Sequence, residues 1–352
     1  MLIIYDRLAM ASKRSRPADL LRWKPRVTLL DIADLSIRLE LDGGEARLLD
    51  GVSLGVHRGE ILGIVGESVS GKSMLALAVL RLLPQGIRIG GGSIRFDGLE
   101  LTGLPEAKLN ALRGSRLSMI FQEPMTALNP AMRVGDQVRE VIQAHLHCDG
   151  DEVRSRVETT LEEVGLTPPQ QVAPLYPHEL SGGMRQRVMI AVAIACAPDL
   201  IIADEPTTSL DVTLQLQILA LLRSIVARRG CALILITHDI GVISAMCDRV
   251  AVMYAGNLVE ICTAATFVAG PHHPYSRLLL ETYVDVNMER VRPLPTITGS
   301  MPFAGQQFAG CRFRPRCPNA LELCTRKPQL IHVGSGHHAA CHRCAPKPGR
   351  AF

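Results

Sequence analysis

The fold of this chain is decided by the stretch Gly66-Glu67-Ser68-Val69-Ser70-Gly71-Lys72-Ser73. It fits the pattern G-x-x-x-x-G-K-[ST] of a phosphate-binding loop. The apolar run 61–65 before it predicts a buried strand, and the helix-forming run 74–80 after it predicts a buried helix. In such a context the backbone N–H groups of the loop bind phosphate oxygens. The alternative is a glycine–serine turn that merely precedes a helix, and the agreement of both flanks disfavours it.

Two side chains at the end of this loop suit a nucleotide. Lys72 is expected to reach the β- and γ-phosphates, and the Ser73 hydroxyl is expected to bind Mg²⁺. The residues from Gly66 to Gly71 are expected to surround the phosphates with backbone N–H groups. The loop therefore predicts a nucleotide site with a magnesium ion.

Length and composition describe a globular protein. The chain has 352 residues, of which 47% are hydrophobic and 20% charged, with a net charge of +4. These values allow one large domain or two ordinary ones. No long run of Lys or Arg indicates nucleic acid, and no apolar run reaches the roughly 18 residues that a bilayer requires. The start lacks the order of a signal peptide, so we expect a cytosolic protein.

Periodic segments predict an α/β protein with a mostly parallel sheet and several additions. Strand-like segments at 27–32, 35–41 and 49–56, broken by a turn at 42–44, predict an antiparallel β subdomain. A further short strand and turn are expected at 93–98.

A helical subdomain is expected to be inserted at about 104–187, with amphipathic helices at 135–146 and 153–164. Strand patterns then return at 200–203 and 232–237, on either side of a helix at 214–228. Strands that alternate with helices indicate a parallel α/β sheet.

Two carboxylates follow the apolar strand 200–203. Asp204 at the strand end is expected to hold the magnesium ion, and Glu205 to orient and deprotonate the attacking water. A surface acidic pair after a core strand is the alternative. The upstream phosphate loop favours the catalytic interpretation.

A second anion site is predicted at the start of another helix. Ser181 is a natural N-cap, and Gly182 and Gly183 let a phosphate approach the first-turn N–H groups. Because the chain already has one phosphate loop, this site is expected to serve a nucleotide held by a partner subunit. An ordinary capped helix is the alternative.

Together these motifs resemble those of ATP-binding cassette (ABC) ATPases. The string from Ser181 to Ala191 resembles the signature of the dipeptide/oligopeptide permease branch, and the likeness covers about 28–345. It implies a Walker A loop at Gly66–Ser73, a Walker B strand ending at Asp204 and a catalytic Glu205. It also implies a D-loop at Ser209-Leu210-Asp211.

The same resemblance assigns two further residues to the site. Gln122 matches the Q-loop glutamine, which contacts Mg²⁺ and the attacking water, and His238 matches the switch histidine at the γ-phosphate. Taken alone, either residue would be an ordinary polar residue at the end of a strand.

Two positions depart from the family pattern. An aromatic ring often stacks on adenine upstream of Walker A, and our register places Leu39 there, which can pack on the base without π-stacking. Val69 stands where relatives commonly have glycine. If the backbone needs a positive φ at that position, valine is strained.

Cysteines cluster near the C-terminus, where prolines multiply and periodicity fades. In a reducing cytosol such a cluster favours a metal over disulfides, and four thiolates suit zinc or an iron–sulfur cluster. The permease resemblance favours [4Fe–4S], while ordinary free cysteines are the alternative. The predicted ligands follow the pattern C-x5-C-x6-C-x16-C and are Cys311, Cys317, Cys324 and Cys341. His272 and His273 are interpreted as a loop before a helix at 276–281.

The sequence thus predicts an N-terminal extension at 1–27, an ABC ATPase domain at 28–265 and a C-terminal peptide-permease-type extension at 266–352. We expect the ATPase subunit of an importer for peptides, on the cytoplasmic face of the inner membrane. The expected partners are a second ATPase subunit, a paralogue rather than a copy, two transmembrane permease subunits and a periplasmic or extracellular solute-binding protein. Alternatives are an importer of nickel, glutathione or another solute, and a soluble ABC ATPase without a transport role.

Overall fold

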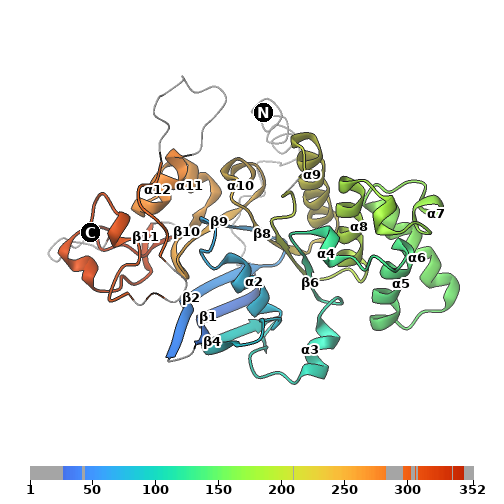
Figure 1. Ribbon diagram of the computed structural model, residues 1–352, viewed down its shortest axis with the longest axis horizontal. Coiled ribbons are helices and arrows are strands. Elements are labelled where there is room, and N and C mark those ends of the chain that lie inside the picture. The colour runs from blue at the N-terminus through green and yellow to red at the C-terminus, as the bar shows by residue number, and fades with distance from the viewer. Residues whose placement is uncertain are drawn as a thin grey trace.

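Two β-sheets and the helices around them form the framework of the computed structural model (Figure 1). It describes residues 27–41, 44–208, 210–282, 296–302, 306, 308–334 and 336–344. Residues 1–26 of the predicted N-terminal extension, two residues of the predicted turn at 42–44 and the tail from residue 345 lie outside the described residues.

The antiparallel sheet has the strand order β2-β1-β4-β5. Its strands are β1 (Thr28–Leu41), β2 (Gly44–His57), β4 (Ile87–Phe96) and β5 (Leu99–Glu100). The prediction of two strands at 27–32 and 35–41 is wrong, because β1 runs through both. The register of β1 with β2 shifts between Ile32 and Leu35, where Asp34 has φ 51°. This irregularity explains the break in the sequence pattern.

The larger sheet has the order β11-β12-β10-β9-β3-β8-β7-β6. Its pairs from β9 to β6 are parallel, and β10 to β11 are added antiparallel at one edge. Every residue of β3, β7 and β8 is buried, as parallel strands covered on both faces require. The bounds are β3 (Ile61–Val65), β6 (Leu117–Ile120), β7 (Leu200–Asp204), β8 (Ala232–Ile236), β9 (Arg249–Tyr254), β10 (Asn257–Thr263), β11 (Ile331–Gly334) and β12 (His337–Ala339).

The helices α5 to α8, from the middle of the chain, lie together at one side of the molecule, on the right in Figure 1. The predicted helices at 135–146, 153–164 and 214–228 are present as α5, α6 and α9, with ends shifted by one to three residues. The described helices are α2 (Lys72–Val79), α3 (Glu106–Leu112), α4 (Pro124–Ala127), α5 (Val134–His145), α6 (Gly150–Glu163), α7 (Pro169–Val172), α8 (Gly182–Ile194), α9 (Val212–Arg229), α10 (Ile240–Met246), α11 (Ala264–Ala269) and α12 (Pro274–Glu281).

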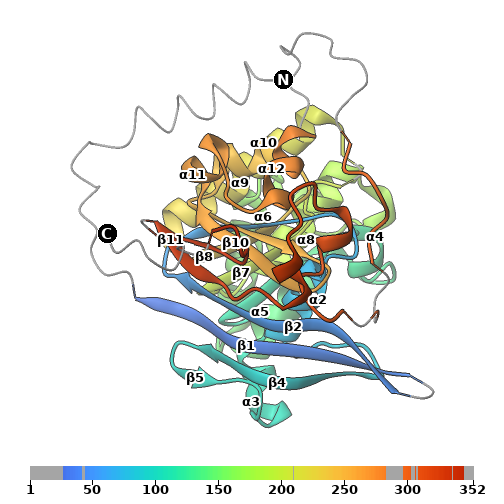
Figure 2. The same cartoon turned by 90° about the vertical axis from the view of Figure 1, so that its left-hand side faces the viewer.

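The phosphate loop lies where the two sheets share a hydrophobic core. Leu75 and Val79 of α2 pack in one cluster with Ile37 and Leu49 of the antiparallel sheet and Ile64 of β3. Figure 2 shows the antiparallel sheet as a layer beneath the larger sheet. The loop that connects β3 to α2 is therefore held by buried elements on both sides.

The C-terminal part of the chain packs against the ATPase core. Phe313 lies with Tyr254 of β9 and Tyr275 of α12 in an aromatic cluster, with ring centroids 5.1 and 5.3 Å from Phe313. Strand β12 extends the larger sheet by pairing with β10. Within the described residues, no helix is both long and apolar enough to span a membrane.

Candidate active site

The phosphate loop has the backbone shape that its glycines allow. Gly66 and Gly71 have φ values of 154° and 100°. A Cβ on Gly66 would lie 2.2 Å from the Met253 carbonyl oxygen, and one on Gly71 would lie 2.6 Å from the side chain of Leu49. Glycine is therefore required at both ends of the loop.

Lys72 points back into the loop that precedes it. Its ammonium group donates to the carbonyl oxygens of Gly66, at 2.9 Å, and Glu67, at 3.0 Å. The residue is 6% exposed, and burial lowers the pKa of its ammonium group. Its third partner is the Ser70 hydroxyl at 3.5 Å, so a buried cation has only neutral oxygens around it and is well placed to bind an incoming phosphate.

Val69 adopts the left-handed backbone conformation, with φ 65°. This confirms that a positive φ occurs at the position where relatives commonly have glycine. The side chain is 71% exposed, so packing does little to offset the strain of a β-branched residue in this region.

Asp204 and Ser73 form a place that fits a divalent cation. Asp204 is 5% exposed, and its Oδ1 has no hydrogen-bond partner among the described residues. Burial raises the pKa of this carboxyl group, while a hydrogen bond from Ser73 opposes the rise. An unsatisfied, buried carboxylate oxygen next to a hydroxyl group offers the oxygen ligands that Mg²⁺ prefers.

Glu205 is the point at which the predicted catalytic residues meet. Its Oε2 accepts a hydrogen bond from Thr208 Oγ1 at 2.9 Å. Gln122 Nε2 and His238 Nδ1 each lie 3.4 Å from the same oxygen. The structure thus brings together Gln122 after β6, Glu205 after β7 and His238 after β8. They meet because the carboxyl ends of parallel strands lie at one edge of a sheet.

The signature residues lie at the start of α8. Ser181 caps the helix by accepting a hydrogen bond from the Met184 amide at 3.3 Å, as its type predicts. Ser181 and Gly182 are exposed, and none of the three signature residues lines the cavity at the phosphate loop. Of the predicted D-loop, Ser209 lies outside the described residues, and Asp211 caps α9.

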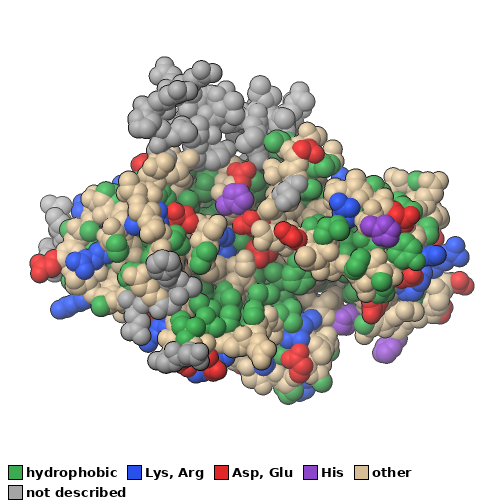
Figure 3. Space-filling view, in the orientation of Figure 1, with side chains coloured by type: hydrophobic (Ala, Val, Ile, Leu, Met, Phe, Trp, Pro, Cys, Tyr) green, Lys and Arg blue, Asp and Glu red, His purple; other side chains and the backbone are tan. Residues whose placement is uncertain are grey.

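A cavity opens at the phosphate loop, bounded on one side by β2. Arg47 and Leu48 of β2 line it together with the residues from Val69 to Met74. Hydrophobic side chains gather on the surface over the region of α2, β1 and β2 (Figure 3). Leu39 does not line this cavity. It is paired with Ala46 and Ile87 within the antiparallel sheet.

Several residues from the C-terminal region were missed by sequence reasoning. Glu67 of the phosphate loop forms a two-point ion pair with Arg316, at 2.7 and 3.1 Å. Its amide donates to Tyr275 Oη at 2.8 Å. These partners are more than 200 residues away along the chain, and no local pattern could have revealed them. The side chains that complete the cavity also come from this region, namely Pro302, Gln306, Phe308 and Arg312.

The four predicted ligand cysteines surround one small cavity of the C-terminal region. All four are free thiols. Burial raises the pKa of Cys311 to about 11, and the neighbouring thiols of Cys324 and Cys317 add to the rise. Cys344 lies outside this cavity lining, and its thiol donates to Cys341, which lowers the pKa of Cys341.

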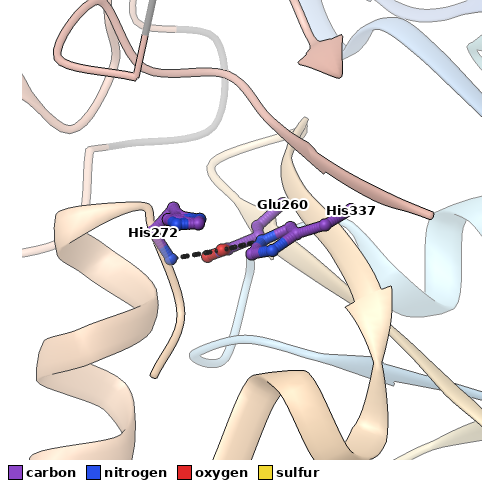
Figure 4. Close-up of side chains that lie close together, drawn as sticks. All are labelled: Glu260, His272 and His337. Atoms are coloured by element: carbon purple, nitrogen blue, oxygen red, sulfur yellow. Dashed lines mark hydrogen bonds and ion pairs between the residues drawn. The ribbon is translucent and has the colours of Figure 1, made fainter. Parts of the chain in front are cut away.

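A second group of possible ligand atoms surrounds Glu260, which is fully buried. Its Oε1 accepts from the backbone amide of His272 at 2.5 Å and lies 2.6 Å from His337 Nε2 (Figure 4). Its Oε2 accepts from the amide of His273 at 3.1 Å. These hydrogen bonds account for the buried carboxylate and hold β12 and the start of α12 to β10. His273 caps α12, in agreement with its interpretation as a residue that precedes a helix.

Nucleotide hydrolysis needs a bound phosphate chain, a cation and an oriented water molecule. The phosphate loop, the pair Ser73 and Asp204, and the Oε2 atom of Glu205 provide for these in turn. The signature helix α8 begins outside this cavity, so the N-terminus of α8 is free to meet a nucleotide on another subunit. This arrangement defines an ATP-binding cassette ATPase.

The chain belongs to the ABC transporter family. Residues 49–208 match the family model of the ABC transporter, and residues 259–324 match that of the oligopeptide/dipeptide transporter C-terminal region. The chain is 45% identical over 317 residues to a probable peptide ABC transporter ATP-binding protein of Sinorhizobium fredii, covering 90% of this chain and 95% of the relative. It is 44% identical over 320 residues to the oligopeptide transport ATP-binding protein OppD of Salmonella typhimurium, covering 91% and 95%.

Solved structures agree with this assignment. A dimeric ATP-binding cassette, MJ0796, in a post-hydrolysis state with ADP and phosphate is 26% identical. The comparison has a TM-score of 0.61 and covers 67% of this chain and 98% of that chain. The α/β cassette fold and the ATPase activity expected from the sequence are therefore confirmed.

Proposed function

We propose that this chain is the ATP-hydrolysing subunit of a membrane importer for peptides or a related small solute. The observation that carries the proposal is the meeting of Gln122 and His238 at Glu205 Oε2. Gln122 lies between β6 and α4, so this contact links the hydrolytic carboxylate to the segment that leads into the helical region. The match to the oligopeptide/dipeptide transporter C-terminal region supports the substrate class. The relatives named above are peptide transport proteins.

In the proposed mechanism the phosphate loop binds ATP and holds its phosphate chain in line with water. Ser73 and Asp204 would hold a Mg²⁺ ion, which would supply positive charge to the phosphate oxygens. Lys72 turns from its carbonyl partners to the phosphates. Glu205 orients the attacking water and accepts its proton, and His238 donates a hydrogen bond to the γ-phosphate.

A partner ATPase subunit completes each site in this proposal. The exposed N-terminus of α8 at Ser181 and Gly182 would bind the γ-phosphate of a nucleotide held on the other subunit. The dimeric state of the similar cassette supports this arrangement. We propose a paralogue as the partner, as the permease resemblance implies.

We propose that the surface around Gln122 docks on two transmembrane permease subunits. Phe121 is 40% exposed and Met125 is 55% exposed, so two large apolar side chains lie near Gln122 where a partner would cover them. Docking there would place the subunit on the cytoplasmic face of the membrane as a peripheral protein. A solute-binding protein would deliver the solute on the opposite side.

We also propose that Cys311, Cys317, Cys324 and Cys341 hold a [4Fe–4S] cluster. They line a common cavity, and Arg314 and Arg343 line it with them and would offset the negative charge of a thiolate-bound cluster. Anaerobically purified protein should contain iron and acid-labile sulfide. Cys317→Ser should lose both, whereas Cys148→Ser, at a cysteine outside the cluster, should retain them. Zinc alone, or no metal, would overturn this assignment.

Reconstitution tests the proposed function. The chain is assembled in vesicles with its paralogue and the two permeases, and ATP hydrolysis is measured as the solute-binding protein is loaded with peptides. Peptide-dependent stimulation with peptide uptake is the expected result. If nickel or glutathione stimulates ATP hydrolysis and no peptide does, the importer carries that solute and not peptides. ATPase activity that never depends on the permeases would favour a soluble ABC ATPase.

A further inference from the structure

The C-terminal region is fastened to the phosphate loop by buried polar contacts. Arg316, with a side chain only 5% exposed, binds both carboxylate oxygens of Glu67. The same guanidinium group donates to the carbonyl oxygens of Ile297, at 3.1 Å, and Thr298, at 2.9 Å. A buried and bidentate arginine pair of this kind fixes two segments in a single relative position.

A second contact links the same region to the other end of the loop. Arg312 donates to the carbonyl oxygen of Ala255. The amide of the next residue, Gly256, donates to the carbonyl oxygen of Ser70 at 2.8 Å. Gly256 has φ 81°, and a Cβ there would lie 2.0 Å from the Leu48 carbonyl oxygen. The turn at Gly256, which only glycine can form, therefore holds Arg312 beside the phosphate loop.

Four described residues of the C-terminal region line the cavity at the phosphate loop. These residues are Pro302, Gln306, Phe308 and Arg312. Phe308 is the one aromatic side chain among the described residues that line the cavity. The antiparallel sheet contributes only Arg47 and Leu48. Adenine is a flat, apolar ring system that gains most from stacking on an aromatic face.

We propose that Phe308 of the C-terminal region provides the surface on which the nucleotide base stacks. This inference rests on the nucleotide site described above and adds the residue that recognises the base. The phosphate loop binds one end of the nucleotide, and Phe308 takes the place of the aromatic ring that the chain lacks on β1. The C-terminal region is then part of the nucleotide site itself.

Binding of two probes to the full chain tests this assignment. Calorimetry with Mg²⁺ and a non-hydrolysable ATP analogue measures the base and the phosphates together, and inorganic tripolyphosphate measures the phosphates alone. Phe308→Ala should weaken binding of the analogue by about 5-fold to 150-fold, the range that loss of one base–aromatic stack gives. Tripolyphosphate binding should be unchanged. Phe308→Tyr should bind the analogue as the native chain does, and Phe308→Leu should be intermediate.

One control variant and three contrary outcomes complete the test. Val268→Ala, at an exposed residue of α11, should change neither affinity. Native-like binding of the analogue by Phe308→Ala would overturn the inference. Equal weakening of both probes would also overturn it, because the substitution would then disturb the phosphate loop. If the native chain binds tripolyphosphate but not the analogue, the nucleotide site itself has been misassigned.

Discussion

Val69 offers a quantitative test of strain in the phosphate loop. A residue with a Cβ in the left-handed region costs about 1–2 kcal/mol, and β-branching adds to the crowding. Glycine removes this cost but loses more chain entropy on folding, by about 0.5–1 kcal/mol. Since the valine side chain is 71% exposed, its removal forfeits little hydrophobic stabilisation. We expect Val69→Gly to raise the free energy of unfolding by about 1 kcal/mol.

The gain should appear in the free energy of unfolding, and it raises nucleotide affinity only by the part of the strain that is added when the loop holds phosphate. A gain of about 1 kcal/mol corresponds to roughly fivefold tighter binding if the strain is stored in the conformation that holds phosphate. Calorimetry with Mg²⁺ and a non-hydrolysable ATP analogue measures the affinity, and urea denaturation measures the free energy of unfolding. Val69→Ala should fall between valine and glycine, and Val69→Ile should resemble the native chain.

The reasoning would be refuted by the opposite order. If Val69→Gly binds the analogue more weakly, the valine methyl groups contribute contacts that outweigh the strain. If affinity and stability both stay unchanged, the positive φ of 65° stores no energy that the site must overcome.

Two further predictions concern helix ends. Ser181→Ala should lower the free energy of unfolding by about 1 kcal/mol, because the Met184 amide loses its cap, whereas Ser181→Thr should keep most of it in urea denaturation. Burial lowers the pKa of His273 to about 4, against about 6.5 in an unfolded chain, so its contribution to stability is complete above about pH 6.5 and is lost as pH falls toward 4. Between about pH 7 and pH 5 the native chain should lose about 2 kcal/mol more than His273→Asn, which keeps a cap for Tyr275; parallel pH profiles would contradict this.

Local chemistry made much of the catalytic centre predictable. Glycine spacing, an apolar strand that ends in carboxylates and a serine before a helix each act over a few residues. The meeting of Gln122, Glu205 and His238 follows because each ends a strand of one parallel sheet. The structure shows their contacts at a single oxygen, Oε2 of Glu205.

Other features depend on contacts that no local pattern encodes. The sequence position of Leu39 predicts a place beside adenine, and Leu39 is absent from the described residues that line the cavity at the phosphate loop. The ion pair of Glu67 with Arg316 joins residues 249 positions apart. Phe308 likewise reaches the cavity only through tertiary packing.

The most direct test of the account is the hydrolytic role of Glu205. Single-turnover phosphate release is measured for the native chain and Glu205→Gln, each assembled with the partner ATPase subunit and Mg²⁺. The variant keeps the hydrogen-bonding shape but cannot accept a proton from water. We expect it to bind ATP as tightly as the native chain does, while phosphate release falls at least about a hundredfold. Undiminished release would contradict the assignment of Glu205 and with it the catalytic centre described here.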